Sequence, residues 1–320
     1  MKTHFIAWWN VENLFDLEDS PARSDKLNRT LQSELRGWNE SILSRKIANL
    51  AAIIRALNDG RGPDLLGVCE VENRPVLQRL VDALAPLGRN YLVAHHDTSD
   101  SRGIDVAFIY DSSKFLAELT FSHTIQKRTA TRELFQVNFR TASNRLLVVV
   151  GNHWPSKLGG SRESEAYRII AGETLAYFNQ RIEDVLGDDT PILAMGDFND
   201  EPCDRSLTDH ALSERNRTRV LYANTPKLLN LMWPLMGHGL GTHYYDNNPG
   251  MLDQFLVSGG MLKSKSKIKP VEESARIVQP ESMTSTGRYA TPVRFGRPNS
   301  GLNLNGASDH FPISMTLTES

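Results

Sequence analysis

Residues 191–200 of the chain read Pro191-Ile192-Leu193-Ala194-Met195-Gly196-Asp197-Phe198-Asn199-Asp200. An apolar run of strand length stops here at a glycine, and short polar side chains follow it. If the strand continues, Asp197 and Asn199 share one face and Asp200 points away. A carboxylate and a carboxamide suit hard cations such as Mg²⁺, Ca²⁺ or Mn²⁺. The same residues also suit an ordinary Asx-rich turn, so the rest of the chain has to decide between a site and a turn.

Other predicted strands also end at a polar side chain. The apolar segment 5–9 ends at Asn10, the segment 64–69 ends at Glu70, and the segment 146–150 is followed by His153. Asp253 lies at the start of the apolar strand 252–258, where an unpaired carboxylate would be costly to bury. Asp309 and His310 directly precede the last strand, 312–317. Together these strand ends favour a hard-metal hydrolytic site over loop composition.

The hydrophobic pattern predicts the elements that carry these residues. Apolar residues at three- and four-residue spacing indicate helices over 44–57, 76–84 and 161–185. Further strands are expected over 91–95, 104–110, 119–125 and 134–139, and the charged segment 17–40 is expected to be a surface loop. Alternating lysines over 263–269 predict a strand with one basic face, either a protected sheet edge or a ribbon that follows phosphates. With no internal repeat and no linker, residues 1–320 are expected to form one α/β domain.

Composition narrows the class of protein without naming a substrate. The 320 residues carry 36 basic and 38 acidic side chains, a net charge of −2, so any contact with nucleic acid has to come from a local patch. Two cysteines, Cys69 and Cys203, are too few for a disulfide framework. No segment is long and apolar enough to span a bilayer. We expect a cytoplasmic protein, or a secreted one if a signal peptide has been removed.

Six motifs in this order resemble the endonuclease/exonuclease/phosphatase superfamily, which includes pancreatic deoxyribonuclease and exonuclease III-type nucleases. They run from the first predicted strand to the last, and are Trp9-Asn10-Val11-Glu12-Asn13, Val68-Cys69-Glu70-Val71-Glu72, Asn152-His153-Trp154-Pro155-Ser156-Lys157, Gly196-Asp197-Phe198-Asn199-Asp200, Leu252-Asp253-Gln254 and Ser308-Asp309-His310. The resemblance implies a four-layer α/β/β/α sandwich of two mixed sheets flanked by helices. It also implies hydrolysis of phosphoesters by in-line attack of water.

The resemblance further implies roles for individual residues. Asn10 and Glu70 match family positions that hold a Mg²⁺-type ion (Mn²⁺ or Ca²⁺ being alternatives), and Asp309 matches one that completes or supports that shell. Asp197 and Asn199 match the pair that orients the attacking water and contacts the phosphate. His310 matches a general base or phosphate ligand polarised by Asp253, and His153 matches a donor to the scissile phosphate.

The sequence leaves the substrate and some phosphate contacts open. Arg102, Ser156 and Lys157 are candidate phosphate-binding residues, although each also suits an exposed loop. A nuclease acting on DNA or RNA is the first hypothesis, and a monomer is expected. The alternatives are a phosphatase or phospholipase C-type enzyme on a small phosphoester, a phospholipid headgroup or a phosphoinositide. A non-catalytic scaffold is disfavoured, because each of these family positions is occupied by a chemically competent residue.

Overall fold

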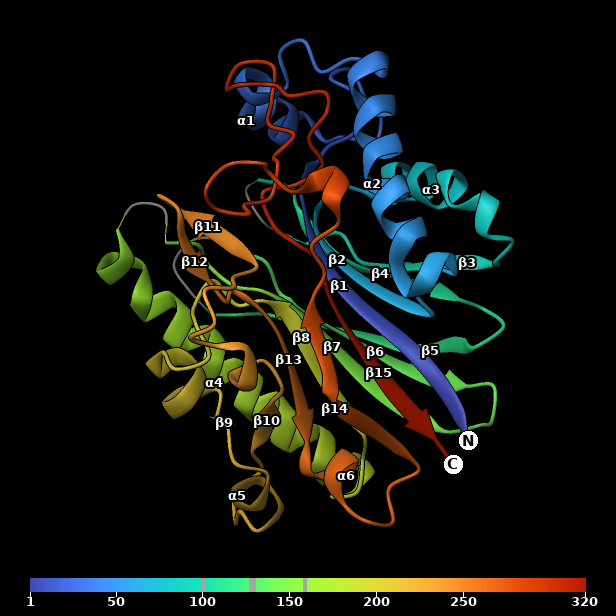
Figure 1. Cartoon of the computed structure of the whole chain (residues 1–320), viewed down its shortest axis with the longest axis vertical. Coiled ribbons are helices and arrows are strands. Elements are labelled where there is room, and N and C mark those ends of the chain that lie inside the picture. The colour runs from blue at the N-terminus through green and yellow to red at the C-terminus, as the bar shows by residue number, and fades with distance from the viewer. Residues whose placement is uncertain (99–101, 127–130, 158–159) are drawn as a thin grey trace.

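The computed structural model describes residues 1–98, 102–126, 131–157 and 160–320, which form two large mixed sheets flanked by helices (Figure 1). The helices are α1 (Asp25–Leu35), α2 (Glu40–Gly60), α3 (Arg74–Ala83), α4 (Ser161–Leu186), α5 (Arg217–Leu221) and α6 (Gly259–Leu262). The strands are β1 (Lys2–Leu14), β2 (Leu65–Val71), β3 (Tyr91–His95), β4 (Asp105–Asp111), β5 (Phe115–His123), β6 (Leu134–Thr141), β7 (Leu146–His153), β8 (Ile192–Asp197), β9 (Ser213–Glu214), β10 (Leu228–Asn230), β11 (His243–Tyr245), β12 (Asn248–Gly250), β13 (Asp253–Ser258), β14 (Ile268–Ile277) and β15 (Ile313–Glu319).

Strand order places the polar strand ends in the middle of each sheet. One sheet has the order β14-β15-β1-β2-β4-β3, and the other has the order β5-β6-β7-β8-β13-β10-β9. β1 and β2 are parallel, as are β7 and β8, so the carboxyl ends of each pair lie at the same edge. The chain termini lie together at the opposite end of the strands (Figure 1).

Alternation along the central strands separates the layers. In β1, Ile6 and Trp8 pack against the second sheet, whereas Ala7 and Trp9 pack with the group of buried residues that includes α2 and α3. The outer face of the second sheet packs on α4, where Ala171 and the residues around it meet Val148, Ala194 and others. The layers are therefore helix, sheet, sheet and helix, which confirms the predicted sandwich. No helix in the described part of the chain is long and apolar enough to cross a membrane.

Two expectations about local structure were wrong. The predicted loop 17–40 contains α1, which Ser24 caps and which buries Leu31 and Leu35 on one face. The first strand does not stop at Asn10 but continues to Leu14 through an irregular register. The leucines of α1 stand at every fourth position, a helical spacing that the prediction overlooked among the charged residues. The continuation of β1 depends on pairing with β2 rather than on local pattern.

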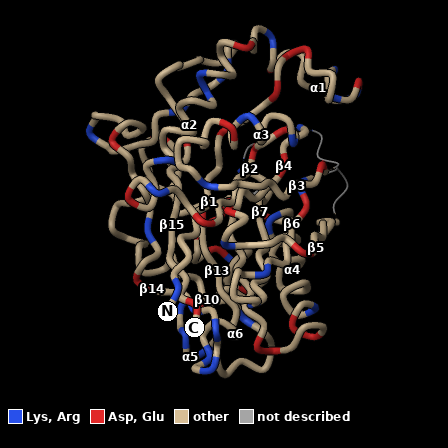
Figure 2. The backbone as a smooth tube through the Cα atoms, turned by 90° about the vertical axis from the view of Figure 1, so that its right-hand side faces the viewer, with Lys and Arg blue, Asp and Glu red and all other residues tan. Residues whose placement is uncertain are grey.

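The predicted basic strand over 263–269 was also wrong. β14 begins only at Ile268, and the Lys263 and Lys265 ammonium groups pair with the Asp189 carboxylate at 2.8 and 2.5 Å. These two lysines therefore form ion pairs with Asp189 in the loop before β8 and do not make the predicted basic face of a strand. Figure 2 shows acidic and basic residues interspersed along the backbone, in keeping with the net charge of −2.

Candidate active site

The strand ends of the two sheets meet around Asp197. In the register of the second sheet, Asp197 lies opposite His153 of β7 on one side and opposite Asp253 of β13 on the other. From the first sheet, the Asn10 amide Nδ2 donates a 3.0 Å hydrogen bond to Asp197 Oδ2. The backbone N–H of Asn199 donates to Asp197 Oδ1 at 2.9 Å. Asp197 is thus held by groups from both sheets.

Burial sets the protonation of Asp197. The residue is 1% exposed, and this burial raises the pKa of its carboxyl to about 6, with His310 opposing the shift and Asp253 adding to it. A carboxylate of that pKa is still ionised at neutral pH, and it accepts a proton more readily than an exposed aspartate does. Asp197 therefore has the properties of a general base.

His310 is oriented by a buried carboxylate. Its Nδ1 lies 2.7 Å from Asp253 Oδ2, and the Trp8 indole Nε1 donates to Asp253 Oδ1 at 3.0 Å. Burial alone would lower the pKa of His310, but the carboxylates of Asp253 and Asp197 outweigh it and raise the pKa well above the ordinary value. His310 Nε2 faces Asp197 Oδ2 at 3.9 Å. A cationic imidazole beside Asp197 can donate to an anionic phosphate oxygen.

His153 has the opposite electrostatic state. Burial lowers the pKa of its imidazole well below the ordinary value, and the cationic Arg132, Arg102 and His310 add to the effect. Its Nε2 lies 3.7 Å from Glu70 Oε1 and 3.8 Å from Asp197 Oδ2, longer than a hydrogen bond. His153 is therefore neutral, and it faces the acidic centre of the site.

Glu70 and Asp309 supply a pair of carboxylates suited to a hard cation. Glu70 adopts a positive φ of 64° at the bend in β2, and its Oε2 accepts the Asn13 backbone N–H at 2.9 Å. Burial raises the pKa of the Asp309 carboxyl and nearby Glu70 adds to the effect, while the cationic His310, Arg294 and Lys46 oppose it. The Asn10 Oδ1 accepts one backbone hydrogen bond, from Glu12 at 3.0 Å, and keeps a second lone pair. This oxygen-rich, under-neutralised donor set fits Mg²⁺ or Mn²⁺.

Not all the predicted residues converge on this centre. The Arg102 guanidinium donates to Asn13 Oδ1 at 2.8 Å, and the Asn13 N–H in turn bonds to Glu70. Ser156 is half-buried and follows the end of β7 by three residues. The Lys157 ammonium instead pairs with Asp200 at 3.1 Å and Asp204 at 3.6 Å. Lys157 is therefore engaged with carboxylates beside the site rather than with its centre.

The segment Gly196–Asp200 does not continue as a strand beyond Asp197. β8 ends at Asp197, and Asn199 has a φ of 51°, which turns its amide Nδ2 to the Trp154 carbonyl at 3.0 Å. The Asp200 carboxylate pairs with the buried Arg168 at 2.7 Å. Asn199 thus ties the segment to β7. Asp200 lies outside the cluster around Asp197 because the chain turns at Asn199, not because the predicted strand alternation continues.

Several residues that contact the segments around the site were not predicted from the sequence. Lys46 is fully buried on α2, and its Nζ donates to the Ala307 carbonyl at 2.6 Å, just before Asp309. Burial lowers the pKa of Lys46 to about 8, against the pull of Glu12 and Asp309. Arg132 donates to the carbonyls of His153 and Trp154 at 3.2 and 3.0 Å. These contacts join residues far apart in the chain, and no local motif marks them.

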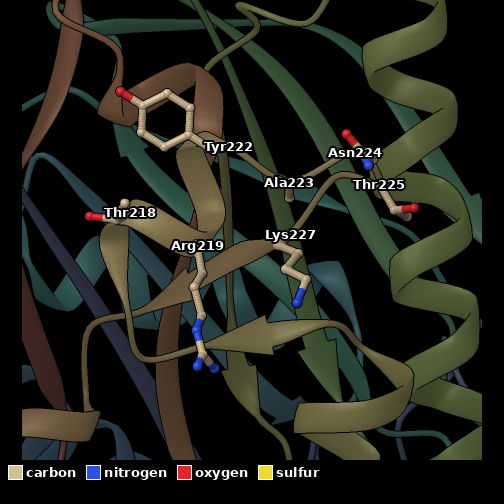
Figure 3. A pocket seen from close by; sticks show the side chains of 7 residues that line it. All are labelled: Thr218, Arg219, Tyr222, Ala223, Asn224, Thr225 and Lys227. Carbon is tan, nitrogen blue, oxygen red and sulfur yellow. The ribbon is translucent and has the colours of Figure 1, made fainter.

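A surface hollow elsewhere on the molecule is unrelated to the strand ends. It has a volume of about 620 Å³ and lies around α5 (Figure 3). The basic groups that line it, Arg219 and Lys227, already face the Glu214 carboxylate at 3.6 and 3.9 Å. The chemistry therefore concentrates at the strand ends and not at this hollow.

Comparison with known proteins identifies the family. Residues 5–319 match the model of the Endonuclease/Exonuclease/phosphatase family. The chain belongs to this family. Its members are phosphoester hydrolases that depend on divalent metal, and the acidic and histidine groups described above are candidate metal ligands. No curated protein sequence matched the chain.

Solved structures of this family share the fold at low sequence identity. Truncated TDP2 from Caenorhabditis elegans is 15% identical with a TM-score of 0.59, over 99% of this chain and 97% of that one. The human Nocturnin catalytic domain is 16% identical with a TM-score of 0.57, over 99% and 94% of the chains. A mannosyl-6-phosphatase from Bacteroides thetaiotaomicron is 15% identical with a TM-score of 0.57, over 98% and 99%.

Proposed function

We propose that the protein is a divalent-metal-dependent phosphodiesterase that hydrolyses its substrate by in-line attack of water, with nucleic acid as the favoured substrate. The observation that carries the proposal is the buried Asp197 carboxylate, held between Asn10 and the His310–Asp253 pair and placed beside His153 and Glu70. One group of the right protonation state is available for each task of phosphoester hydrolysis.

The proton transfers follow from the charges of these side chains. Asp197 orients the attacking water and accepts its proton, because its carboxylate is ionised at neutral pH and is held on both oxygens. His310 is already protonated and donates to a non-bridging phosphate oxygen, so it is not the base. Neutral His153 donates a hydrogen bond to the phosphate. Asp253 keeps the His310 ring in place.

The metal half of the proposal involves Glu70, Asp309 and Asn10. These residues would hold a Mg²⁺ or Mn²⁺ ion, which when bound neutralises phosphate charge and stabilises the leaving oxygen. Arg102, whose guanidinium lies next to Asn13, extends the positive side of the site toward the phosphate. Asn199 acts here by holding the Asp197 segment against Trp154. Ser156 remains a candidate phosphate contact, whereas Lys157 would have to leave Asp200 and Asp204 to reach the substrate.

A second candidate function is hydrolysis of a small phosphomonoester or phospholipid headgroup. The near-neutral charge favours it, as does the loss of the predicted basic strand, since Lys263 and Lys265 are paired with Asp189. The structural relative from Bacteroides thetaiotaomicron is a mannosyl-6-phosphatase, which shows that the fold also serves a small phosphate ester.

A substrate panel separates these functions. Purified protein with Mg²⁺ or Mn²⁺ is assayed on plasmid DNA, single-stranded DNA, RNA, bis-p-nitrophenyl phosphate and p-nitrophenyl phosphate. We expect turnover of the diesters, and a loss on the order of 10²–10⁴-fold in Asp197→Ala and His310→Ala. The matched controls are the exposed Asp209→Ala and His238→Ala, which should keep activity. Turnover of the monoester alone would exclude the nuclease, and activity retained in Asp197→Ala would refute the site.

A further inference from the structure

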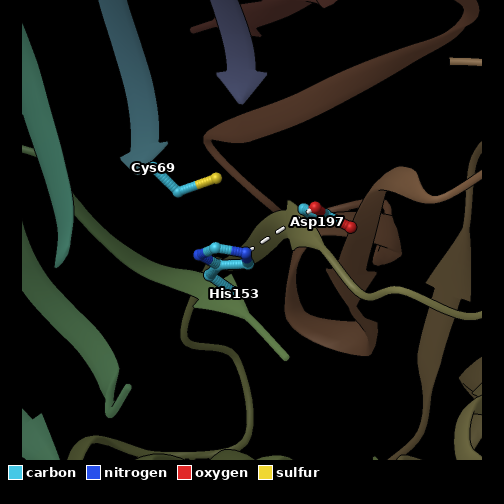
Figure 4. A group of neighbouring side chains, drawn as sticks. All are labelled: Cys69, His153 and Asp197. Carbon is cyan, nitrogen blue, oxygen red and sulfur yellow. Dashed lines mark ion pairs between the residues drawn. The ribbon is translucent and has the colours of Figure 1, made fainter. Parts of the chain in front are cut away.

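One group at the site is chemically out of place among hard oxygen ligands: the thiol of Cys69. Cys69 precedes Glu70 on β2, is completely buried and is a free cysteine. One ligand atom each from Cys69, His153 and Asp197 lie within 4.8 Å of one another (Figure 4). The three side chains come from three strands in two sheets, so the sandwich itself brings them together.

The geometry points to a second metal site: we propose that Cys69, His153 and Asp197 bind a thiophilic divalent cation of the Zn²⁺ class. Such an ion shares Asp197 and His153 with the proposed catalytic machinery. It would therefore act as an inhibitor of the Mg²⁺-supported reaction, a consequence that rests on the proposed function. Binding itself does not depend on what the enzyme hydrolyses.

The histidine is poised as a ligand. The His153 side chain is 2% exposed, and Nε2 is the ring nitrogen that faces the Asp197 and Glu70 carboxylates. Its Nε2 and Asp197 Oδ2 are 3.8 Å apart, too far for a hydrogen bond. A dashed line joins the two side chains in Figure 4. An ion about 2.0–2.2 Å from each atom spans that gap, which is the range of zinc–nitrogen and zinc–carboxylate bonds. The neutral imidazole is also the form that binds metals.

The thiol decides which metals bind. Sulfur is a soft ligand that Mg²⁺ and Ca²⁺ avoid, whereas Zn²⁺ and Co²⁺ accept it together with imidazole and carboxylate. When the metal–sulfur bond forms, the S–H bond breaks and the proton leaves to solvent. Without a metal the buried thiol stays protonated, because burial and the neighbouring Asp197 and Glu70 carboxylates raise its pKa well above the ordinary value. A bound divalent cation offsets the negative charge of these two carboxylates and so stabilises the thiolate.

Cobalt reports directly on the sulfur. Metal-free full-length protein is titrated with Co²⁺, and absorbance is followed in the near ultraviolet, where sulfur-to-cobalt charge transfer appears only if a thiolate is bound. We expect the band in the wild type and in Cys203→Ser, whose exposed thiol lies outside the cluster, and we expect Cys69→Ser to lose it. A band that survives in Cys69→Ser, or no band in the wild type, overturns the proposal.

Zinc supplies two further tests, and the first of them needs no variant. X-ray absorption of the zinc-loaded wild type should show one sulfur neighbour at about 2.3 Å, and a shell of nitrogen and oxygen alone contradicts the site. In the assay with excess Mg²⁺, Zn²⁺ should inhibit the wild type at a concentration at least about tenfold lower than it inhibits Cys69→Ser, a difference of about 1.4 kcal/mol in binding. A protein that shows the cobalt band but no hydrolysis refutes the proposed function and leaves the metal site standing.

Discussion

The pairing of His310 with Asp253 fixes the charge of the site at the level of single side chains. Asp253 is completely buried, and both its oxygens are used, one by His310 Nδ1 and one by the Trp8 indole. A carboxylate buried in this way holds the imidazole in one orientation and in its protonated form. Among the described residues, the Asp253 side chain bonds to His310 and Trp8, so we expect it to act through His310.

Replacement of Asp253 by Asn tests that positioning role. The variant keeps the shape of the side chain but removes the charge that sustains protonated His310, so we expect kcat to fall on the order of 10²–10⁴-fold. KM should change less than kcat, because only the His310 contact with the phosphate weakens, while the proposed metal ligands and Arg102 remain. Trp8→Phe, which leaves the Asp253 charge in place, should lose much less. Steady-state kinetics on the best substrate of the panel checks both, and an unchanged kcat in Asp253→Asn would refute the role of the pair.

The sequence predicts some of these side chains well and others not at all. Asp197, Asp253 and His310 are recognisable because each interrupts or directly adjoins an apolar strand, where a polar group needs a reason. Lys157 looked equally suitable as a phosphate ligand, but it lies against Asp200 and Asp204. Which of two anions a flexible lysine meets depends on the relative position of two loops, and sequence spacing does not determine that.

At the level of single elements, too, some features could be predicted from the sequence and others could not. α2 was predictable from its apolar stripe, but the stripe hides Lys46, whose Nζ reaches Ala307 in the segment before β15. The contact spans 261 residues, and it carries a cation close to Glu12 and Asp309. α2 therefore does more than cover a sheet: it places a buried positive charge behind the proposed metal ligands.

Helix α4 carries a carboxyl whose ionisation opposes folding. Burial and the nearby Asp188 raise the pKa of Glu183 to about 7 from the ordinary value of 4.5. A raised carboxyl pKa gives stability that is fully present below about pH 4.5 and is lost as pH rises through about 7. Glu183→Gln, which stays neutral, should therefore raise the melting temperature by a few degrees at pH 8 and leave it unchanged at pH 4. Thermal unfolding at the two pH values measures this, with Glu165→Gln on the same helix as the control. An equal change at both pH values would contradict the assigned pKa.

At the scale of the whole molecule, the site depends on two sheets meeting face to face. Asn10 and Glu70 belong to one sheet, and His153, Asp197 and Asp253 belong to the other. The contact between the sheets is made close by glycines: a Cβ on Gly67 would lie 2.5 Å from the Trp8 ring and 2.9 Å from the Met195 methyl group. The four-layer arrangement was predictable from ordered motifs, but the closeness of the sheets comes from packing that no motif encodes.

Gly151→Ala tests whether the sandwich behaves as one cooperative unit. A Cβ at Gly151 would lie 2.5 Å from Val106 Cγ1 and 2.9 Å from the Phe108 ring, across the interface between the sheets. Overpacking of this kind should cost about 1–3 kcal/mol of unfolding free energy. If residues 1–320 fold as one domain, tryptophan fluorescence and far-ultraviolet circular dichroism should report the same single transition in urea, shifted to lower concentration in the variant. Gly287→Ala, with no atom within 4 Å of the added Cβ, should leave the midpoint unchanged. Separate transitions for the two probes would mean that the sheets unfold independently, and the site between them would then be less stable than either sheet.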